Sequence, residues 1–519
     1  MATTDEPASR HLVEHLRRKA GREADPERKG ALGQFMTPLP VARFMAAMFD
    51  RWDLPEIRLL DAGAGVGSLT AALLDAWFAR GPDAAPVAVT ACEIDHALRR
   101  HLARTLAAYQ GEAAAHGLTL RTGILAGDFV ERGTELMLPL GGGPRFTHAI
   151  LNPPYKKLDS GSAHRRLLRE VGIETVNLYT AFVALAAGLL EPGGELVAIV
   201  PRSFCNGPYY RPFRAWMSER AALTHLHLFE SRRKAFADDG VLQENVIARW
   251  VRGAPEGDVA VSWCEDATFA GLRRRVRPFA SIVHPGDPER FIRIPLDAEG
   301  DAGPAAGAAD GSPLFSTTLT ELGLAVSTGP VVDFRLRTHL RDEPEPGAVA
   351  LLYPQHFAAG GLRWPAKGKK ANAIVVNAET ERWLFPRGRY VLTKRFTSKE
   401  EPRRVVAHVV EPDALPGDRL GLENHLNVFH AGRRGIDSDL AHGLALFLNS
   451  SLVDRRFRLF SGHTQVNATD LRSLRYPPDA ILRSLGRWAR ARGAPLSQEE
   501  IDGRVGRSAG GSAWPNTPA

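Results

Sequence analysis

The tetrapeptide Asn152-Pro153-Pro154-Tyr155 follows the apolar run THAI at residues 147–150, with Leu151 between them. An amino nitrogen attached to an aromatic ring or an amide is a poor nucleophile, because its lone pair is delocalised. The side-chain oxygen of Asn152 and the carbonyl oxygen of Pro153 can accept its hydrogens and localise charge on it. The two proline rings restrict the backbone that aims these acceptors, and Tyr155 offers a face for a planar substrate. A rigid Asn-Pro turn after a strand is the alternative.

A glycine-rich turn lies upstream, in LLDAGAGVGSLTAALL from Leu59 onward. The segment reads as a strand, a turn containing Gly63 and Gly65, and a helix. Glycines let the backbone approach a ligand closely at the start of a helix, so the turn is a candidate site for a nucleotide-like cofactor. Asp61, at the end of the strand, can pair with an ammonium group of that ligand. The alternative is a tight turn that serves packing alone.

Two further acidic residues end the next two predicted strands. Glu93 follows the second strand and can accept hydrogen bonds from both hydroxyls of a ribose. Asp128 follows the third strand, where it can accept from an adenine amino group, with Phe129 packed on the ring. A solvated charge at Glu93 and a helix-capping role for Asp128 are the simpler alternatives.

The elements that position these residues alternate between short apolar strands and helices from about Ile57 to Arg252, which indicates a doubly wound parallel sheet. Leu178, Phe182, Leu185 and Leu189 recur at helical spacing, and EPGG at 191–194 is expected to end that helix and turn the chain. Seven strands are predicted, at residues 57–63, 87–94, 124–128, 147–152, 195–201, 223–231 and 245–251.

The chain changes character after about residue 296. Residues 297–313 are rich in Gly, Ala and Pro and are predicted to form a linker. An irregular α+β domain is expected at 314–492 and a flexible tail at 493–519. Between residues 361 and 410, twelve Lys and Arg stand against four acidic residues and are interleaved with aromatic side chains. This composition favours nucleic acid over a merely solvated basic face. Candidate DNA contacts are Arg395, Gln465, Lys156 and Lys157. An exposed helix start explains Lys156 and Lys157 equally well.

Composition narrows the class of protein. The 519 residues allow several domains, and the net charge of +7 permits a nucleic-acid partner without requiring one. Three cysteines without a C-x-x-C pair, and no His cluster at ligand spacing, signal neither a zinc site nor a disulfide framework. Since neither a signal peptide nor a transmembrane helix is indicated, we expect a cytoplasmic protein without a membrane partner.

Together these motifs resemble those of class I S-adenosylmethionine-dependent methyltransferases that act on amino nitrogens, which have a Rossmann-like sheet. The stretch GALGQFMTPLPVARFMAAMF, residues 30–49, looks like the N-terminal motif of the gamma class of adenine-N6 DNA methyltransferases. That resemblance implies a catalytic domain at 30–296 after a helical extension at 1–29. It also implies that Thr37 and Pro38 touch the methionine end of the cofactor. Phe236, in KAFADDGVLQENVIARW, matches the aromatic residue that holds the flipped base.

Four segments of the C-terminal half, beginning at Val326, Tyr390, Glu423 and Ser461, resemble the target-recognition half of PstI/BsuBI-type modification methylases. This narrower resemblance implies methylation of the adenine in CTGCAG within a restriction-modification system. It also implies a separate endonuclease; we expect a monomer that acts on double-stranded DNA. The alternatives are a methyltransferase for protein glutamine, RNA or cytosine-N4, and a non-catalytic DNA-binding specificity subunit. NPPY disfavours cytosine-N4, where a serine usually opens the motif.

Overall fold

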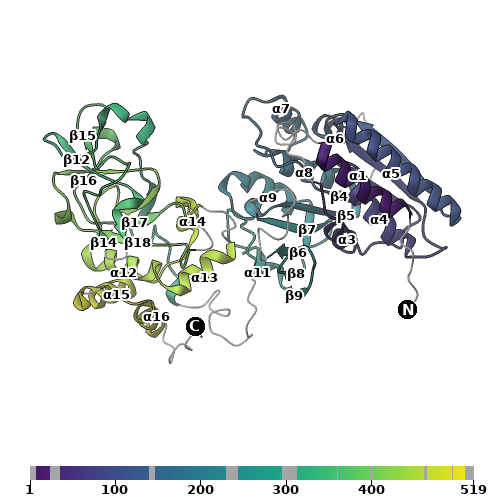
Figure 1. Ribbon diagram of the computed structural model, residues 1–519. Helices are drawn as coiled ribbons and strands as arrows, with labels where there is room; N and C mark the ends of the chain where they lie inside the picture. Colours follow the sequence, from purple (N-terminus) through teal and green to yellow (C-terminus); the bar gives the residue numbers. More distant parts are fainter. Residues whose placement is uncertain are drawn as a thin grey trace. The chain divides into compact units, whose positions relative to one another are not determined.

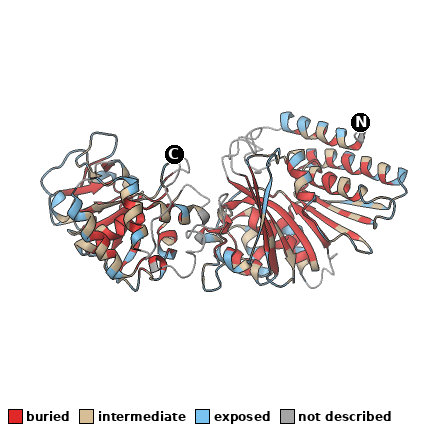
Figure 2. Cartoon of the chain, turned by 90° about the horizontal axis from the view of Figure 1, so that it is seen from below, coloured by how far each residue is buried: buried red, intermediate tan, exposed pale blue. Residues whose placement is uncertain are grey.

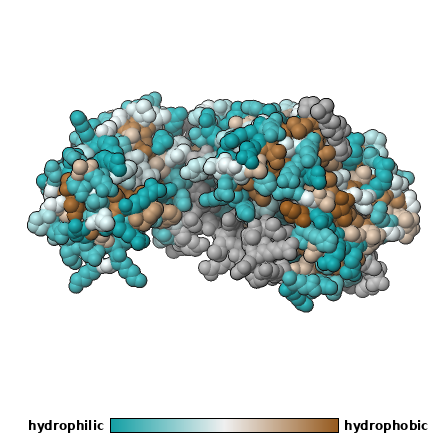
Figure 3. Space-filling model, turned by 90° about the horizontal axis from the view of Figure 1, so that it is seen from above, coloured by the Kyte–Doolittle hydropathy of each residue, from teal (hydrophilic) through white to brown (hydrophobic). Residues whose placement is uncertain are grey.

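The computed structural model describes residues 8–23, 36–138, 146–229, 244–294, 313–358, 361–397, 401–460, 465–493 and 495–508. The chain divides into two compact units, Met1–Leu296 and Asp297–Ala519 (Figure 1). Among the described residues, no helix is long and apolar enough to cross a membrane. Hydrophilic residues cover much of the molecular face in Figure 3, and apolar residues lie in smaller groups between them.

A nine-stranded mixed sheet forms the centre of the first unit, in the order β3-β2-β1-β4-β5-β7-β6-β8-β9. Its first five strands are parallel, and β7 lies antiparallel between β5 and β6. Figure 2 shows the central strands of this sheet buried over most of their length, whereas the edge strands β3 and β9 are only partly buried or exposed. The strands are β1 Ile57–Ala62, β2 Val87–Glu93, β3 Leu120–Ala126, β4 Phe146–Leu151, β5 Leu190–Pro201, β6 Ala221–Phe229, β7 Asn245–Arg252, β8 Val259–Cys264 and β9 Arg273–Arg277.

Helices cover both faces of this sheet. On one face α3, α4 and α5 pack over residues such as Leu59 and Ile199. On the other face α6, α8 and α9 pack over residues such as Leu60 and Val200. The helices of the unit are α1 Ala8–Glu23, α3 Leu39–Ala46, α4 Ser68–Phe78, α5 His96–Ala115, α6 Phe129–Met137, α7 Ala163–Glu170, α8 Leu178–Leu189, α9 Arg211–Ser218 and α11 Phe279–Ile282. The expected α/β class is therefore confirmed.

Three details differ from the sequence-based expectation. All seven expected segments form strands, but β8 and β9 extend the sheet to nine. The EPGG segment at 191–194 lies inside β5, where the pairing with β4 is irregular, and does not form a turn after α8. Part of the expected flexible tail is the helix α16, Gln498–Arg507. Ser497 and Glu500 form a reciprocal capping box that stabilises its first turn.

The chain order predicts a ligand site, which we call the crevice, at one edge of the sheet. The chain runs from β1 outward through β2 to β3, and then returns to the other side of β1 as β4. Open α/β sheets bind ligands outside the carboxyl ends of the strands at such a reversal. Asp61, Glu93 and Asn152 lie at or just beyond the carboxyl ends of β1, β2 and β4.

The second unit is built from small sheets and helices. A four-stranded antiparallel sheet has the order β10-β20-β17-β18, and a five-stranded sheet has the order β11-β15-β12-β19-β16. The strands are β10 Ala325–Thr328, β11 Leu340–Arg341, β12 Ala348–Leu352, β13 Phe357–Ala358, β14 Gly361–Leu362, β15 Ala373–Val375, β16 Phe385–Pro386, β17 Tyr390–Lys394, β18 Ala407–Val410, β19 Arg419–Leu422 and β20 Leu426–His430. The helices are α12 Ser438–Leu448, α13 Ser451–Phe460, α14 Ala468–Ser473, α15 Asp479–Arg492 and α16. One core cluster joins strands β10, β17, β18 and β20 to helices α12 to α16.

Candidate active site

The glycine turn after β1 has the backbone conformation that only glycine adopts easily. Gly63 and Gly65 have φ angles of 80° and 59°. The turn is tied to the neighbouring strand, because the Gly65 amide donates a hydrogen bond to Glu93 Oε2 at 2.8 Å. Met36 lies against the turn, with its sulfur 3.5 Å from where a side chain on Gly65 would begin. The turn and the segment before α3 therefore form one wall of the crevice.

Glu93 is held rigidly at this wall. Its side chain is 4 % exposed, and its other oxygen, Oε1, accepts a hydrogen bond from the Asp95 amide at 2.8 Å. Burial raises the pKa of the carboxyl above its usual range. Each carboxylate oxygen has a second lone pair, so Glu93 can still accept hydrogen bonds from the hydroxyls of a ligand.

Asp61 lies deeper in the crevice and is fully buried. Its Oδ2 accepts hydrogen bonds from the amide and the hydroxyl of Thr70 in the first turn of α4. Its Oδ1 is buried and has no hydrogen-bond partner among the described residues. Burial is the main cause that raises the pKa of Asp61 to about 7. Burying a carboxylate oxygen without a partner costs free energy, and a cationic group of a bound ligand would lower that cost.

Asn152 connects three elements at the mouth of the crevice. Its Nδ2 donates to the hydroxyl oxygen of Thr37 at 3.0 Å, so Oδ1 faces the other way. The Tyr155 hydroxyl lies 3.2 Å from that Oδ1 and 3.3 Å from the carbonyl oxygen of Ile199 in β5. Thr37 is 4 % exposed, and Pro38 follows it as the residue before α3. The carboxamide therefore has a fixed orientation, with Oδ1 as the acceptor.

Tyrosines that the sequence analysis did not select lie beside this group. The rings of Tyr155 and Tyr179 meet edge to face with centroids 6.1 Å apart, and the Tyr210 ring follows at 5.7 Å from Tyr179. The Tyr179 hydroxyl pairs with Ser203, and the Tyr210 hydroxyl accepts from the Asn177 amide. Burial raises the pKa of both Tyr155 and Tyr179, so both stay protonated at neutral pH. Tyr179 could have been selected from the sequence, because it is a tyrosine in an otherwise apolar helix and its hydroxyl needs a hydrogen-bond partner.

Asp128 and Phe129 lie at the end of β3, one strand beyond Glu93. Asp128 caps α6, since its Oδ1 accepts from the Val130 amide at 2.7 Å. Its Oδ2 lies 3.1 Å from Nε2 of His164, in α7. Phe129 is 2 % exposed and packs against Phe182 with ring centroids 5.0 Å apart. The capping role is thus present, and a role toward an adenine ring stays a prediction.

Fewer contacts define the positions of the remaining predicted site residues. Phe236 lies outside the described residues. Lys156 and Lys157 are exposed directly after the NPPY segment, where the Lys156 carbonyl oxygen accepts from the Leu178 amide at 2.8 Å. Pro153 is buried and Pro154 is half-buried between Asn152 and Tyr155.

In the second unit, Arg395 and Gln465 come together although 70 residues separate them in sequence. Phe396 and Gln465 form a β-bridge, and the Val466 amide donates to the Arg395 carbonyl oxygen at 2.7 Å. The basic stretch around them is not one continuous patch. Arg404 is fully buried, and Arg387 and Arg389 form ion pairs with Asp413 and Glu411. Counting charges along the sequence therefore overstated the positive surface.

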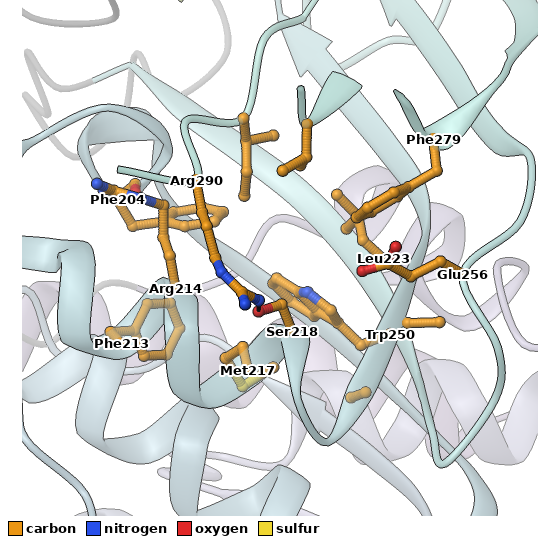
Figure 4. Close-up of a pocket in the computed structure, with 14 residues that line it drawn as sticks. Phe204, Phe213, Arg214, Met217, Ser218, Leu223, Trp250, Glu256, Phe279 and Arg290 are labelled. Atoms are coloured by element: carbon orange, nitrogen blue, oxygen red, sulfur yellow. Dashed lines mark hydrogen bonds between the residues drawn. The ribbon is translucent and has the colours of Figure 1, made fainter. Parts of the chain in front are cut away.

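A well-formed apolar pocket lies elsewhere in the first unit, between α9, β6, β7 and residues 279–292 (Figure 4). Phe204, Leu223 and Trp250 line its interior. At the pocket, Arg290 bonds Ser218, and Arg214 donates from Nη1 to backbone carbonyl oxygens. It contains none of the predicted site residues, so we assign the chemistry to the crevice.

Comparison with known proteins identifies the family. The chain is 46% identical to the type II methyltransferase M.BsuBI of Bacillus subtilis over 482 residues, covering 92% of this chain and 94% of that protein. It is 42% identical to the type II methyltransferase M.PstI of Providencia stuartii over 481 residues, covering 92% and 93%. This chain belongs to the type II methyltransferases of restriction-modification systems. The predicted resemblance to PstI/BsuBI-type methylases is thereby confirmed.

One family model and one solved structure add to this comparison. The model for the Eco57I restriction-modification methylase family matches residues 129–236, a range that contains the NPPY segment. Among solved structures, the cryo-electron microscopy structure of a DrdV–DNA complex has a TM-score of 0.50 and 12% identity. That match covers 92% of this chain and 59% of the other, and it supports the fold alone.

Proposed function

We propose that the protein transfers a methyl group from S-adenosylmethionine to the 6-amino nitrogen of an adenine in double-stranded DNA. The observation that carries this proposal is the carboxamide of Asn152, held between Thr37 and Tyr155 with its oxygen as the acceptor. Such an oxygen can accept a hydrogen from the adenine amino group and localise charge on its nitrogen. Membership of the type II methyltransferases supplies the reaction class.

The crevice fits S-adenosylmethionine in three respects. Asp61 offers a buried carboxylate oxygen without a partner, which suits the ammonium group of the cofactor. Glu93 stands beside the glycine turn, where a ribose can bond to its carboxylate. Gly63 and Gly65 leave the turn without side chains, so that the cofactor can approach the backbone. When bound, the cofactor supplies an electrophilic methyl group on a sulfonium.

The chain's own residues then position the substrate nitrogen. The Asn152 side chain and the Pro153 carbonyl oxygen accept its two hydrogens, and Tyr155 stacks on the adenine ring. In a duplex this amino group is paired, so the base must leave the stack, at a cost of about a few kcal/mol. Phe236 is proposed to hold the other face of the extruded ring. We further propose a monomer acting in the cytoplasm beside a separate endonuclease, with CTGCAG as the first site to test.

The test is to express the protein in a host that lacks adenine and cytosine methylation, and to sequence the genomic DNA by direct detection of modified bases. We expect modified adenine at nearly every copy of one short palindrome. Asn152→Ala is the matched control, and we expect at least a 100-fold slower transfer with cofactor binding retained. Modified cytosine, or modification that Asn152→Ala leaves intact, would refute the assignment.

A further inference from the structure

Four segments of the second unit meet at the turn between β19 and β20. Glu423, at the start of this turn, pairs with Val331, and the Asn424 amide donates to the Val331 carbonyl oxygen at 2.9 Å. On another side, the Arg395 amide donates to the His425 carbonyl oxygen at 2.9 Å. Because Arg395 is itself joined to residues 465 and 466, the turn is supported by backbone pairing from several directions.

His425 is held in one orientation at the tip of this turn. The Glu423 side chain is fully buried and accepts from the backbone amide of His425 at 2.9 Å and from its Nδ1. The imidazole is nevertheless 45 % exposed. Within the described part of the chain, its Nε2 has no hydrogen-bond partner. A buried carboxylate thus orients an exposed ring nitrogen that is available to an external ligand.

One exposed phenylalanine lies beside this imidazole, and a second lies on the neighbouring segment that follows Val331. Phe396 is 43 % exposed, and its ring centroid lies 5.1 Å from that of His425. Phe334, which is 60 % exposed, follows Val331 on the segment that pairs with Glu423. Among the described residues of the second unit, these are the exposed large hydrophobic side chains. Each has an arginine over its ring, Arg395 at 5.7 Å and Arg335 at 5.5 Å.

Basic residues border the same surface. Lys370 forms an ion pair with Asp333 at 2.6 Å, which brings the exposed loop containing Lys367 and Lys369 next to Phe334. Val331, whose backbone pairs with Glu423 and Asn424, lies two residues before Asp333, so this basic loop and the turn that holds His425 are on adjoining segments. A surface that combines cations, exposed aromatic rings and an oriented ring nitrogen suits a polyanion whose interior offers flat, hydrogen-bonding edges.

We propose that this surface enters a groove of duplex DNA and that His425 contacts a base edge through Nε2. We call it the His425 face and define it as Phe334, Arg335, Lys369, Arg395, Phe396 and His425. Arg335 and Lys369 contact phosphates and set the position, whereas His425 contributes to the choice of sequence. Glu423 is a positioning residue that fixes the ring. This inference rests on the proposed function and names the surface that performs its DNA recognition.

The test measures binding of the full chain to a short duplex containing the site found in the genome, and to a duplex with one base pair of that site changed. For His425→Ala we expect cognate affinity to fall about tenfold or more and non-cognate affinity to stay within about twofold. His442→Ala is a matched control, because His442 also lies near a carboxylate, at 3.3 Å from Glu411, but on α12. We expect it to bind as the wild type does.

Two further variants separate the contacts to phosphates from the contact to bases. Lys369→Ala should weaken binding to both duplexes equally and reduce the salt slope of the logarithmic affinity by about 1, because Lys369 is exposed on the same loop. His425→Gln keeps a polar side chain and guards against misfolding of the alanine variant; it should change the preference among altered base pairs. Melting curves show whether each variant is folded.

The outcomes are distinguishable. If the wild type binds no duplex, the proposed function fails together with this inference. If the wild type discriminates between the duplexes and folded His425→Ala and His425→Gln do so equally well, only the His425 assignment is overturned. Tighter binding of the wild type to the single strand than to the duplex would overturn the groove assignment.

Discussion

The crevice of the first unit and the His425 face of the second unit are assembled in different ways. In the crevice, each polar group lies at or just beyond the end of a parallel strand, as Asp61, Glu93 and Asn152 do after β1, β2 and β4. In the His425 face, the side chains come from turns between short strands of different sheets. A parallel sheet brings the ends of its strands to one edge, so sequence position alone places the first group. No comparable rule predicts from the sequence which turns form the His425 face.

The two regions also differ in exposure. Asp61 and Glu93 are 0 % and 4 % exposed, whereas Phe334 and Phe396 are 60 % and 43 % exposed. A small ligand can be enclosed by buried groups, but a duplex can be contacted only by groups that protrude. If the units divide cofactor binding and DNA recognition in this way, damage to one should spare the other.

The largest effect is expected from Gly443→Ala in α12, which should destroy the second unit alone. A methyl group there would meet the Leu482 carbonyl oxygen of α15 at 1.8 Å, and backbone cannot move aside as a side-chain end can. We expect a loss of about 3 kcal/mol or more in the free energy of unfolding of that unit. Calorimetric melting and DNA binding measure this loss, while cofactor binding by titration calorimetry should persist.

Gly503→Ala is the control for that variant. It lies in α16, where a methyl group would meet only the end of the Arg507 side chain at 3.6 Å. Alanine in a helix should be neutral or stabilising by up to about 1 kcal/mol. Loss of cofactor binding in folded Gly443→Ala would contradict the division between the units.

A smaller effect, about 2 to 3 kcal/mol between pH 5 and pH 8, is expected from the pH dependence of Asp61. Its pKa is about 7 when folded and 3.8 as the ordinary value, so the folded chain binds the proton more tightly. The contribution to stability is therefore complete below about pH 4 and is lost as pH rises to about 7. Relative to Asp61→Asn, the wild type should become less stable over this interval, as denaturant unfolding at pH 5 and pH 8 would measure.

Thr70→Val tests the cause of this pH dependence. The Thr70 hydroxyl lies 2.6 Å from Asp61 Oδ2 and lowers the pKa of Asp61. Its removal should move the upper end of the interval to higher pH. A wild type and an Asp61→Asn variant whose stabilities run parallel from pH 5 to pH 8 would show that Asp61 stays ionised in the fold.

Periodicity and strand ends were sufficient to predict the first seven strands, helix α8 and the positions of Asp61, Glu93 and Asn152 at the ends of their strands. The edge strand β9 was missed because its sequence, RRRVR, hides the apolar alternation; charged side chains are a common protection of an exposed edge. Helix α16 was missed although Ser497 and Glu500 supply a capping signal, because Gly, Ser and Pro dominate the surrounding composition.

The features that the sequence did not predict depend on contacts between residues far apart in the chain. The pairing of Asn152 with Thr37 joins positions 115 residues apart, and local spacing carries no information about it. The same holds for the pairing that brings Gln465 to Phe396. The charge of the stretch 361–410 was correct as a sum, but partners such as Asp413 and Glu411 lie outside it in sequence. Whether a charge is on a surface or in a pair depends on such partners.

The smallest effect is expected from Thr37→Val, which replaces the hydroxyl by a methyl group of similar size. The variant leaves Asn152 in place but removes the oxygen that accepts from its Nδ2 at 3.0 Å. The carboxamide can then rotate and turn its oxygen away from the substrate, so we expect kcat to fall about tenfold, the worth of one such hydrogen bond. Thr37→Ser keeps the hydroxyl and should transfer at nearly the wild-type rate. Equal rates for Val and Ser at saturating cofactor would mean that the Thr37 hydroxyl does not orient Asn152.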